Sequence, residues 1–189
     1  VLDNNVWVSN IGTSCQLSCA ASYPVYDKQY RSNTFCHVNE NLWMMMGANV
    51  TGGIGLKWLK NKIVHADSFD ATNALAETVP AGSDGLIFLP YLSGARCPYN
   101  DSGARGMFWG LTLDHTQAHL IRSTMEGIIF SLYECYEVFR SCGMKPEKMI
   151  ASGGGARGDL FLRIQADMYN CEIYTNLGKD QSCIGAAIA

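Results

Sequence analysis

Apolar and polar residues alternate along the first quarter of the chain in short runs that are typical of β-strands separated by turns. The runs rich in Val, Ile, Phe and Trp predict four strands, at Val6–Ile11, Gln16–Ala21, Thr34–Val38 and Leu42–Gly47. Because the breaks between them are short and polar, the pattern predicts a succession of hairpins.

The period of the apolar residues changes after the Gly52-Gly53 pair. Ile54, Trp58 and Leu59 fall on one face of a helix, so a helix is expected to begin near these glycines.

The middle of the chain predicts short elements and one long loop. Asp70–Thr78 has the pattern of a short helix that ends before Pro80, and Leu86–Leu89 has that of a buried strand. Residues 93–106, which contain two Gly-Ala-Arg repeats, are expected to form a loop.

The longest predicted element is a helix with a plausible N-cap at Thr116 and an end before Gly143. Its apolar residues recur at spacings of three and four, which predicts a core-facing stripe of Ile121, Met125, Ile128, Leu132, Tyr136 and Phe139. Arg122 and Glu126 stand four residues apart on this helix, and we expect them to form a solvated or interface ion pair.

Strands and helices alternate in the last quarter of the chain. The pattern predicts a strand at Met149–Ser152, a helix at Leu160–Tyr169, a strand at Glu172–Thr175 and the start of a helix at Gln181. Strands followed by such alternation indicate an α/β layer architecture, here in one domain. Because the sequence stops within a helical pattern, we expect it to be truncated at this end.

Composition excludes several classes of protein. The chain has 189 residues, is 48% hydrophobic and carries a net charge of -3, with basic residues scattered singly, so a nucleic acid is not expected as a partner. No apolar run approaches the roughly 18 residues of a membrane span, and no signal peptide is recognised at the start. The eight cysteines include no CxxC pair, so we expect reduced thiols, no metal site and a cytoplasmic location.

Three consecutive glycines, 153–155, lie between a predicted strand and a predicted helix. This arrangement is typical of an anion or nucleotide site, but a tight turn that lets a helix pack on a sheet explains it equally well. Two further glycine turns occupy similar junctions, one at Gly12-Thr13-Ser14 and one at Gly52-Gly53. Three such turns in an α/β domain that begins with hairpins are typical of the actin-like ATPase domains, where the nucleotide lies between the turns.

The chain also resembles a known family over almost its whole length. The segments at 85–132 and 151–170, together with "IGTS", "TFCHVNENLWMMMGANVTGGIGLKWL" and the closing "GAAIA", are similar to the carboxy-terminal domain of the FGGY carbohydrate kinases. The resemblance implies an actin-like (ribonuclease H-like) α/β fold, with a mixed sheet flanked by helices. Within the family, "LPYLSGAR" and "FCHV" look most like xylulokinases and gluconokinases.

The resemblance implies that ATP phosphorylates a sugar hydroxyl in a cleft between two actin-like domains. By position, the turn of Gly12, Thr13 and Ser14 would meet the β- and γ-phosphates. Gly53 would head the helix beneath the nucleotide, and Lys57, one turn on, would lie within reach of it.

The resemblance places the adenosine at the second glycine turn. Gly154 and Gly155 would let the backbone approach it closely, followed by Ala156. Gly158 stands where some members of the family have a polar side chain, which calls into question a side-chain contact to adenine from this position. Asp159 begins the next helix and is expected to serve the helix dipole or to pair with Arg163.

One family feature is missing. The aspartate that takes the proton from the sugar belongs to a motif well upstream of the Gly-Thr-Ser turn, and Asp3 is too close to that turn to be it. The catalytic aspartate is therefore expected upstream of Val1, the first residue of the sequence.

We expect residues 1–189 to be the nucleotide-binding domain alone, truncated at both ends and inactive by itself, with no catalytic residue or metal ligand of its own. ATP, Mg²⁺ bound through ATP, and a sugar held by the absent amino-terminal domain are the expected ligands, and a homodimer is also considered. The alternative is a free-standing actin-like module that binds a nucleotide or a protein and catalyses nothing.

Overall fold

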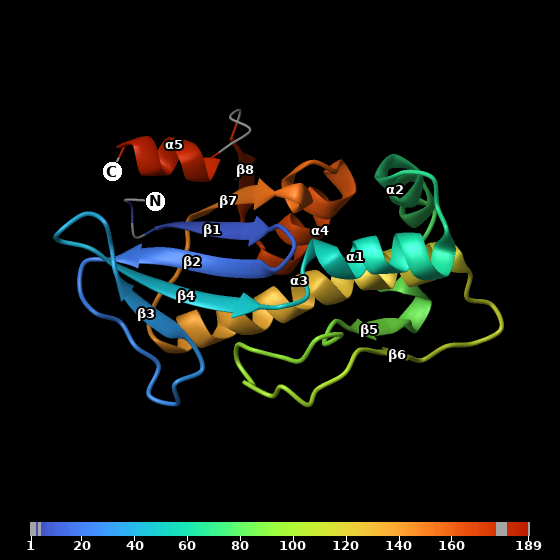
Figure 1. The fold of residues 1–189 in the computed structure, drawn as a ribbon, viewed down its shortest axis with the longest axis horizontal. Helices are drawn as coiled ribbons and strands as arrows, with labels where there is room; N and C mark the ends of the chain where they lie inside the picture. Colours follow the sequence, from blue (N-terminus) through green and yellow to red (C-terminus); the bar gives the residue numbers. More distant parts are fainter. Residues whose placement is uncertain (1–2, 4, 177–180, 189) are drawn as a thin grey trace.

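The computed structural model describes residues 3, 5–176 and 181–188 and is built on a six-stranded mixed sheet (Figure 1). Its order is β3-β4-β2-β1-β7-β8, in which β1 pairs antiparallel with β2 and parallel with β7. The strands are β1 (Val6–Ile11), β2 (Cys15–Ala21), β3 (Asn33–Cys36), β4 (Trp43–Asn49), β7 (Lys148–Gly153) and β8 (Glu172–Thr175). The expected mixed sheet flanked by helices is therefore confirmed.

The helices follow the predicted periodicity closely. They are α1 (Gly53–Leu59), α2 (Phe69–Glu77), α3 (Gln117–Ser141), α4 (Asp159–Tyr169) and α5 (Gln181–Ile188). A π-helical turn, Lys60–Val64, continues α1, and the 3-10 turns Ser83–Gly85 and Gly154–Ala156 precede β5 and α4. Thr116 caps α3 as predicted, in a capping box with His119.

The first four strands form two hairpins, β1–β2 and β3–β4, but the hairpins are joined by a third antiparallel pair, β2–β4. The strand order therefore differs from the chain order, because β3 lies at the sheet edge beyond β4. The alternation of apolar residues sets which face of each strand is buried, and it carries no information on which hairpin strand becomes central.

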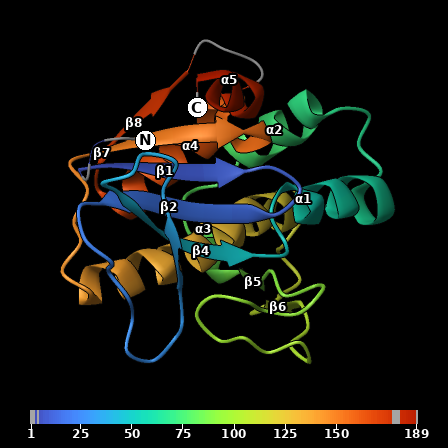
Figure 2. The same cartoon turned by 60° about the vertical axis from the view of Figure 1, so that its left-hand side comes forward.

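A two-stranded hairpin covers the side of α3 that faces away from the six-stranded sheet. It consists of β5 (Ile87–Leu89), which was predicted, and β6 (Met107–Trp109), which the sequence placed next to a loop and did not predict as a strand. In both views α3 lies between the six-stranded sheet and this hairpin (Figures 1 and 2). A Cβ at Gly127 of α3 would come within 2.2 Å of the Phe88 carbonyl oxygen, so the glycine allows this close contact.

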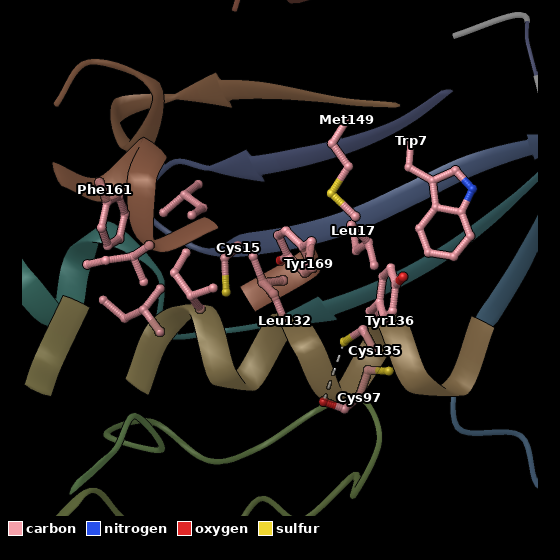
Figure 3. Close-up of a cluster of buried hydrophobic side chains, with 14 of the residues drawn as sticks. Trp7, Cys15, Leu17, Cys97, Leu132, Cys135, Tyr136, Met149, Phe161 and Tyr169 are labelled. Atoms are coloured by element: carbon pink, nitrogen blue, oxygen red, sulfur yellow. Dashed lines mark hydrogen bonds between the residues drawn. The ribbon is translucent and has the colours of Figure 1, made fainter. Parts of the chain in front are cut away.

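The core lies between the six-stranded sheet and α3 (Figure 3). All six residues of the predicted stripe on α3 are buried. Trp7 of β1 packs its ring 5.3 Å from the rings of both Tyr136 and Phe139. Four cysteines are also buried in the core, as expected for small apolar side chains: Cys15, Cys19, Cys97 and Cys135.

The ion pair on α3 is buried, which corrects the prediction of a solvated or interface pair. Arg122 Nε lies 2.6 Å from Glu126 Oε1, and both residues are buried. Glu126 also accepts hydrogen bonds from the Gly82 N–H and the Ser83 hydroxyl, which fixes the segment before β5 against α3. The pair is buried because this distant segment packs over it.

The structure also distinguishes the two alternatives for Asp159, which were a pair with Arg163 and an interaction with the helix dipole. Arg163 pairs with Glu77 of α2, which leaves Asp159 to the first turn of α4, where its charge is favourable to the helix dipole.

No helix among residues 3, 5–176 and 181–188 is long and apolar enough to cross a membrane. The same residues contain no group of three or more His, Cys, Asp or Glu side chains placed to hold a metal ion.

A cavity at the carboxyl ends of β1 and β7

The parallel pair β1–β7 brings two glycine turns together. Ile11 ends β1 opposite Gly153, which ends β7, so the turns that follow these strands leave the sheet at the same edge. From here β1 returns antiparallel into β2, whereas β7 leads into α4. Open α/β sheets commonly bind ligands outside the carboxyl ends of their parallel strands, and this edge of the sheet is such a place.

A cavity of about 550 Å³ opens at this edge. The two turns, α1, α2 and the start of α4 form its walls, and Ile11, Leu56, Met125 and Phe161 contribute apolar surface. Its volume lies within the range of roughly 300–1,000 Å³ that is usual for small-molecule sites.

The first turn is bonded to the start of α1. The N–H groups of Gly52 and Ile54 donate to the Thr13 carbonyl at 3.1 Å, and that of Gly53 donates to the Gly12 carbonyl at 2.8 Å. A Cβ would come within 2.3 Å of the Ser14 carbonyl oxygen at position 52, and within 2.6 Å of the Gly12 carbonyl oxygen at position 53. The Gly52-Gly53 pair therefore serves the packing of α1 on the turn, and the first N–H groups of α1 are already bonded to the protein.

Thr13 itself remains available to a ligand. Its side chain is exposed and lines the cavity, and within the described part of the chain neither its N–H nor its hydroxyl donates a hydrogen bond. Lys57, one turn into α1, lines the same wall.

Two of the three consecutive glycines have a structural purpose. Gly153 has a φ of 76°, in the left-handed region, and a Cβ there would stand 2.5 Å from the Ile11 carbonyl oxygen. A Cβ at Gly155 would lie 2.7 Å from the Ile11 Cβ and 2.9 Å from the Phe161 ring. For these two positions the tight-turn explanation of the sequence is correct.

Gly12 and Gly154 differ from them. Neither has a positive φ. The nearest atom to an added Cβ would be 3.9 Å away at Gly12 and 3.7 Å away at Gly154, which is ordinary van der Waals contact. Both residues line the cavity, so a side chain at either position would extend toward the cavity without meeting the protein. Nothing in the fold requires a glycine here, whereas a ligand that approaches the backbone would.

The structure brings most of the expected site residues to this cavity. Those that line it are Gly12, Thr13, Gly53, Lys57, Gly154, Gly155 and Gly158, whereas Ser14 and Ala156 do not. The sequence did not predict Phe69, Asp70 and Asn73 of α2, or Arg157, as lining residues. The helix that carries the first three was found, but which of its faces meets a cavity depends on packing between distant segments.

The resemblance described above predicts a catalytic aspartate upstream of Val1. The structure describes residues 3, 5–176 and 181–188, so this expectation stays a prediction.

The charges around the cavity are mixed. Lys57 and Arg157 contribute positive charge, and Asp70 contributes negative charge from α2. Apolar walls with a few polar groups suit a ligand that has a flat apolar part and a polar or anionic part.

Known proteins are similar to this chain in sequence and in fold. Residues 8–189 match the family described as "FGGY family of carbohydrate kinases, C-terminal domain". The chain is 32% identical to a xylulose kinase of Bacillus subtilis, over 100% of this chain and 38% of that protein. It is 34% identical to a gluconokinase of Bacillus licheniformis, over 94% of this chain and 37% of that protein.

The crystal structure of a ligand-bound xylulose kinase from Lactobacillus acidophilus superposes with a TM-score of 0.92 at 30% identity, covering 99% of this chain and 38% of that one. The expected actin-like ATPase fold is thus confirmed. The chain spans less than two fifths of the length of each of these three proteins.

Proposed function

Because the chain belongs to the FGGY family of carbohydrate kinases, as its carboxy-terminal domain, we propose that it is the ATP-binding lobe of a sugar kinase. In this proposal the complete kinase transfers the γ-phosphate of ATP to a sugar hydroxyl. The relatives named xylulose kinase and gluconokinase support a xylulose or a related pentulose as the sugar, with gluconate as the other candidate. A cytoplasmic location and a possible homodimer stay predictions of the sequence.

Three features of the cavity support ATP as its ligand. Gly12 and Gly154 leave a cradle that a Cβ would fill, as expected where a nucleotide touches the main chain. The free N–H and hydroxyl of Thr13 are suitable donors to phosphate oxygens, and Lys57 adds a positive charge on the same side.

The adenosine is assigned to the opposite side of the cavity, between α2 and the start of α4. Asp70 lies on that side, and its carboxylate would repel phosphates, whereas it tolerates an uncharged base or ribose. ATP supplies the phosphoryl group, and Mg²⁺ would be held chiefly by the phosphates, as is usual for this ion.

The remaining parts of the reaction are assigned outside residues 1–189. We propose that the catalytic aspartate and the sugar contacts belong to the amino-terminal domain of the complete kinase, upstream of Val1. The 189-residue chain alone is then expected to release no ADP in the presence of pentoses, hexoses or gluconate in a coupled assay. Sugar-dependent turnover by this chain would contradict the assignment.

The observation that carries the nucleotide assignment is the space beside Gly154, and two neighbouring glycines provide a matched test. Gly154→Ala should leave the unfolding free energy within roughly 0.5 kcal/mol of wild type, because its Cβ meets no protein atom closer than 3.7 Å. It should nevertheless weaken ATP binding by roughly tenfold or more, measured by calorimetry with the complete kinase. Gly155→Ala should instead lower stability by about 1–3 kcal/mol through overpacking against Ile11 and Phe161.

Normal ATP affinity in Gly154→Ala would refute the assignment. In that case the cavity does not hold the nucleotide against this turn.

A further inference from the structure

We propose that Asn73 of α2 is the residue that recognises the base in this cavity, by pairing its side-chain amide with the 6-amino group and an adjacent ring nitrogen of adenine. This inference rests on the proposed function, which assigns ATP to the cavity, and adds the residue that selects the nucleotide. It stems from a contact between α2 and the start of α4.

Asn73 takes the space that a side chain at position 158 would need. A Cβ on Gly158 would stand 3.0 Å from Asn73 Nδ2 and 3.9 Å from Asn73 Oδ1. The backbone at Gly158 has φ −111° and ψ 126°, an extended conformation that any residue adopts. The glycine is therefore not required by backbone geometry, and its small size leaves room for the Asn73 amide.

Helix α2 holds Asn73 in a defined place. Ser68 caps the helix by accepting a hydrogen bond from the Ala71 N–H at 3.0 Å, and Thr72 and Ala76 of the same helix are buried. Glu77 pairs with Arg163, which links α2 to α4 one turn beyond the site. A recognition residue needs such support, because a loosely held amide discriminates poorly.

The Asn73 amide is free to bind a ligand. It lines the cavity, is half-buried, and makes no side-chain hydrogen bond to any other residue that the structure describes. An amide carries both a donor and an acceptor, so it can accept from the 6-amino group of adenine and donate to a neighbouring ring nitrogen at the same time.

The position of Asn73 also agrees with the direction of the nucleotide. Asp70 lies three residues earlier on α2 and lines the same wall, so the two side chains are neighbours on the helix surface. Its negative charge disfavours phosphate there and leaves this wall to the base and ribose.

The test compares ATP with purine riboside triphosphate, which lacks only the 6-amino group, by calorimetric titration of the complete kinase. Wild type should bind ATP about tenfold or more tightly than the analogue, since one good bidentate pair to a base corresponds to roughly that ratio. Asn73→Leu should bind the two within about twofold of each other, through loss of ATP affinity. Asn61→Leu makes the same chemical change at an exposed asparagine outside the cavity, and it should keep the wild-type ratio.

Gly158→Ala provides a second variant that leaves residue 73 unchanged. Its Cβ would push the Asn73 amide aside, so the preference for ATP should fall. Alanine is a poorer N-cap residue than glycine, so a modest fall in melting temperature is also expected, whereas the ratio of the two affinities reports on the base alone. A wild-type ratio in folded Asn73→Leu would overturn the inference, as would equal binding of both nucleotides by wild type. In both of those cases ATP still binds, and the proposed function stands. Failure of wild type to bind ATP at all would overturn both proposals.

Discussion

Removing Glu126 should destabilise the domain far more than removing an ordinary acidic residue from the same helix. In Glu126→Ala the buried Arg122 guanidinium loses its carboxylate partner, and the Gly82 N–H and the Ser83 hydroxyl lose their acceptor. Ser83 also has a φ of 49°, so the segment that Glu126 holds is in an uncommon conformation.

The magnitude follows from the burial of the pair. Breaking a buried ion pair by removing one partner costs about 3–5 kcal/mol, because a charge is left without compensation. Both side chains keep 9% exposure, so water can reach the charge in part and the lower end, about 3 kcal/mol, is expected. For a domain of this length that corresponds to a fall in melting temperature of roughly 6–12 °C.

The assay is urea unfolding followed by circular dichroism, with Glu137→Ala as the matched control. Glu137 also pairs with an arginine on α3, but both members of that pair are about half exposed, at 52% and 50%, with 4.0 Å between charged atoms. Its loss should change stability by at most about 0.5 kcal/mol. The double variant Arg122→Met, Glu126→Met should recover much of the loss, since it leaves no unpaired charge.

Equal losses for Glu126→Ala and Glu137→Ala would refute this reasoning. The reasoning would also be refuted if the double variant Arg122→Met, Glu126→Met were as unstable as Glu126→Ala.

Three further outcomes are expected. Leu132→Ala should cost about 2–5 kcal/mol in urea unfolding, since the side chain is fully buried, and a loss under about 0.5 kcal/mol would contradict its place in the core. Gly127→Ala should lower the melting temperature, because its Cβ would collide with the Phe88 carbonyl oxygen, and an unchanged value would mean that β5 does not contact α3 there. Hydrogen bonds from Arg31 lower the pKa of Asp27 from 3.8 to about 2, so this carboxylate stabilises the fold fully above about pH 4 and loses its effect as the pH falls toward 2. The stability deficit of Asp27→Asn in urea unfolding should therefore shrink between pH 5 and pH 2, and a constant deficit would contradict the pairing.

The sequence predicts local structure well wherever the chain itself sets the period. The stripe on α3 and its Thr116 cap were predicted because both depend on residues only three or four apart. Strand β6 was missed since its three residues become a strand only by pairing with β5, about twenty residues earlier. Likewise, the spacing of Arg122 and Glu126 puts them on one face, but burial depends on the segment of Gly82 and Ser83, which packs on that face from elsewhere in the chain.

The candidate site likewise has features that the sequence predicts and features that only the structure reveals. The glycine turns are recognisable in the sequence, but only the structure separates Gly153 and Gly155, which the fold needs, from Gly154, which it does not. Asn73 gave no signal because a single asparagine in a short helix is unremarkable. Its proximity to Gly158, 85 positions later, depends on how α2 and α4 pack.

The pairing of β1 with β7 also determines when the cavity can first exist. During synthesis the β1–β2 hairpin emerges well before the parallel partner of β1, which begins at Lys148, so one wall of the cavity is missing until that later segment has been made. Joining strands so distant in sequence is a slow step, because the entropy of closing a long loop is lost before the contacts between the strands stabilise the product. A ligand bound here stabilises only molecules in which that step is complete. Nucleotide affinity can thus serve as a probe of completed folding. It would not detect intermediates that have formed only the β1–β2 and β3–β4 hairpins.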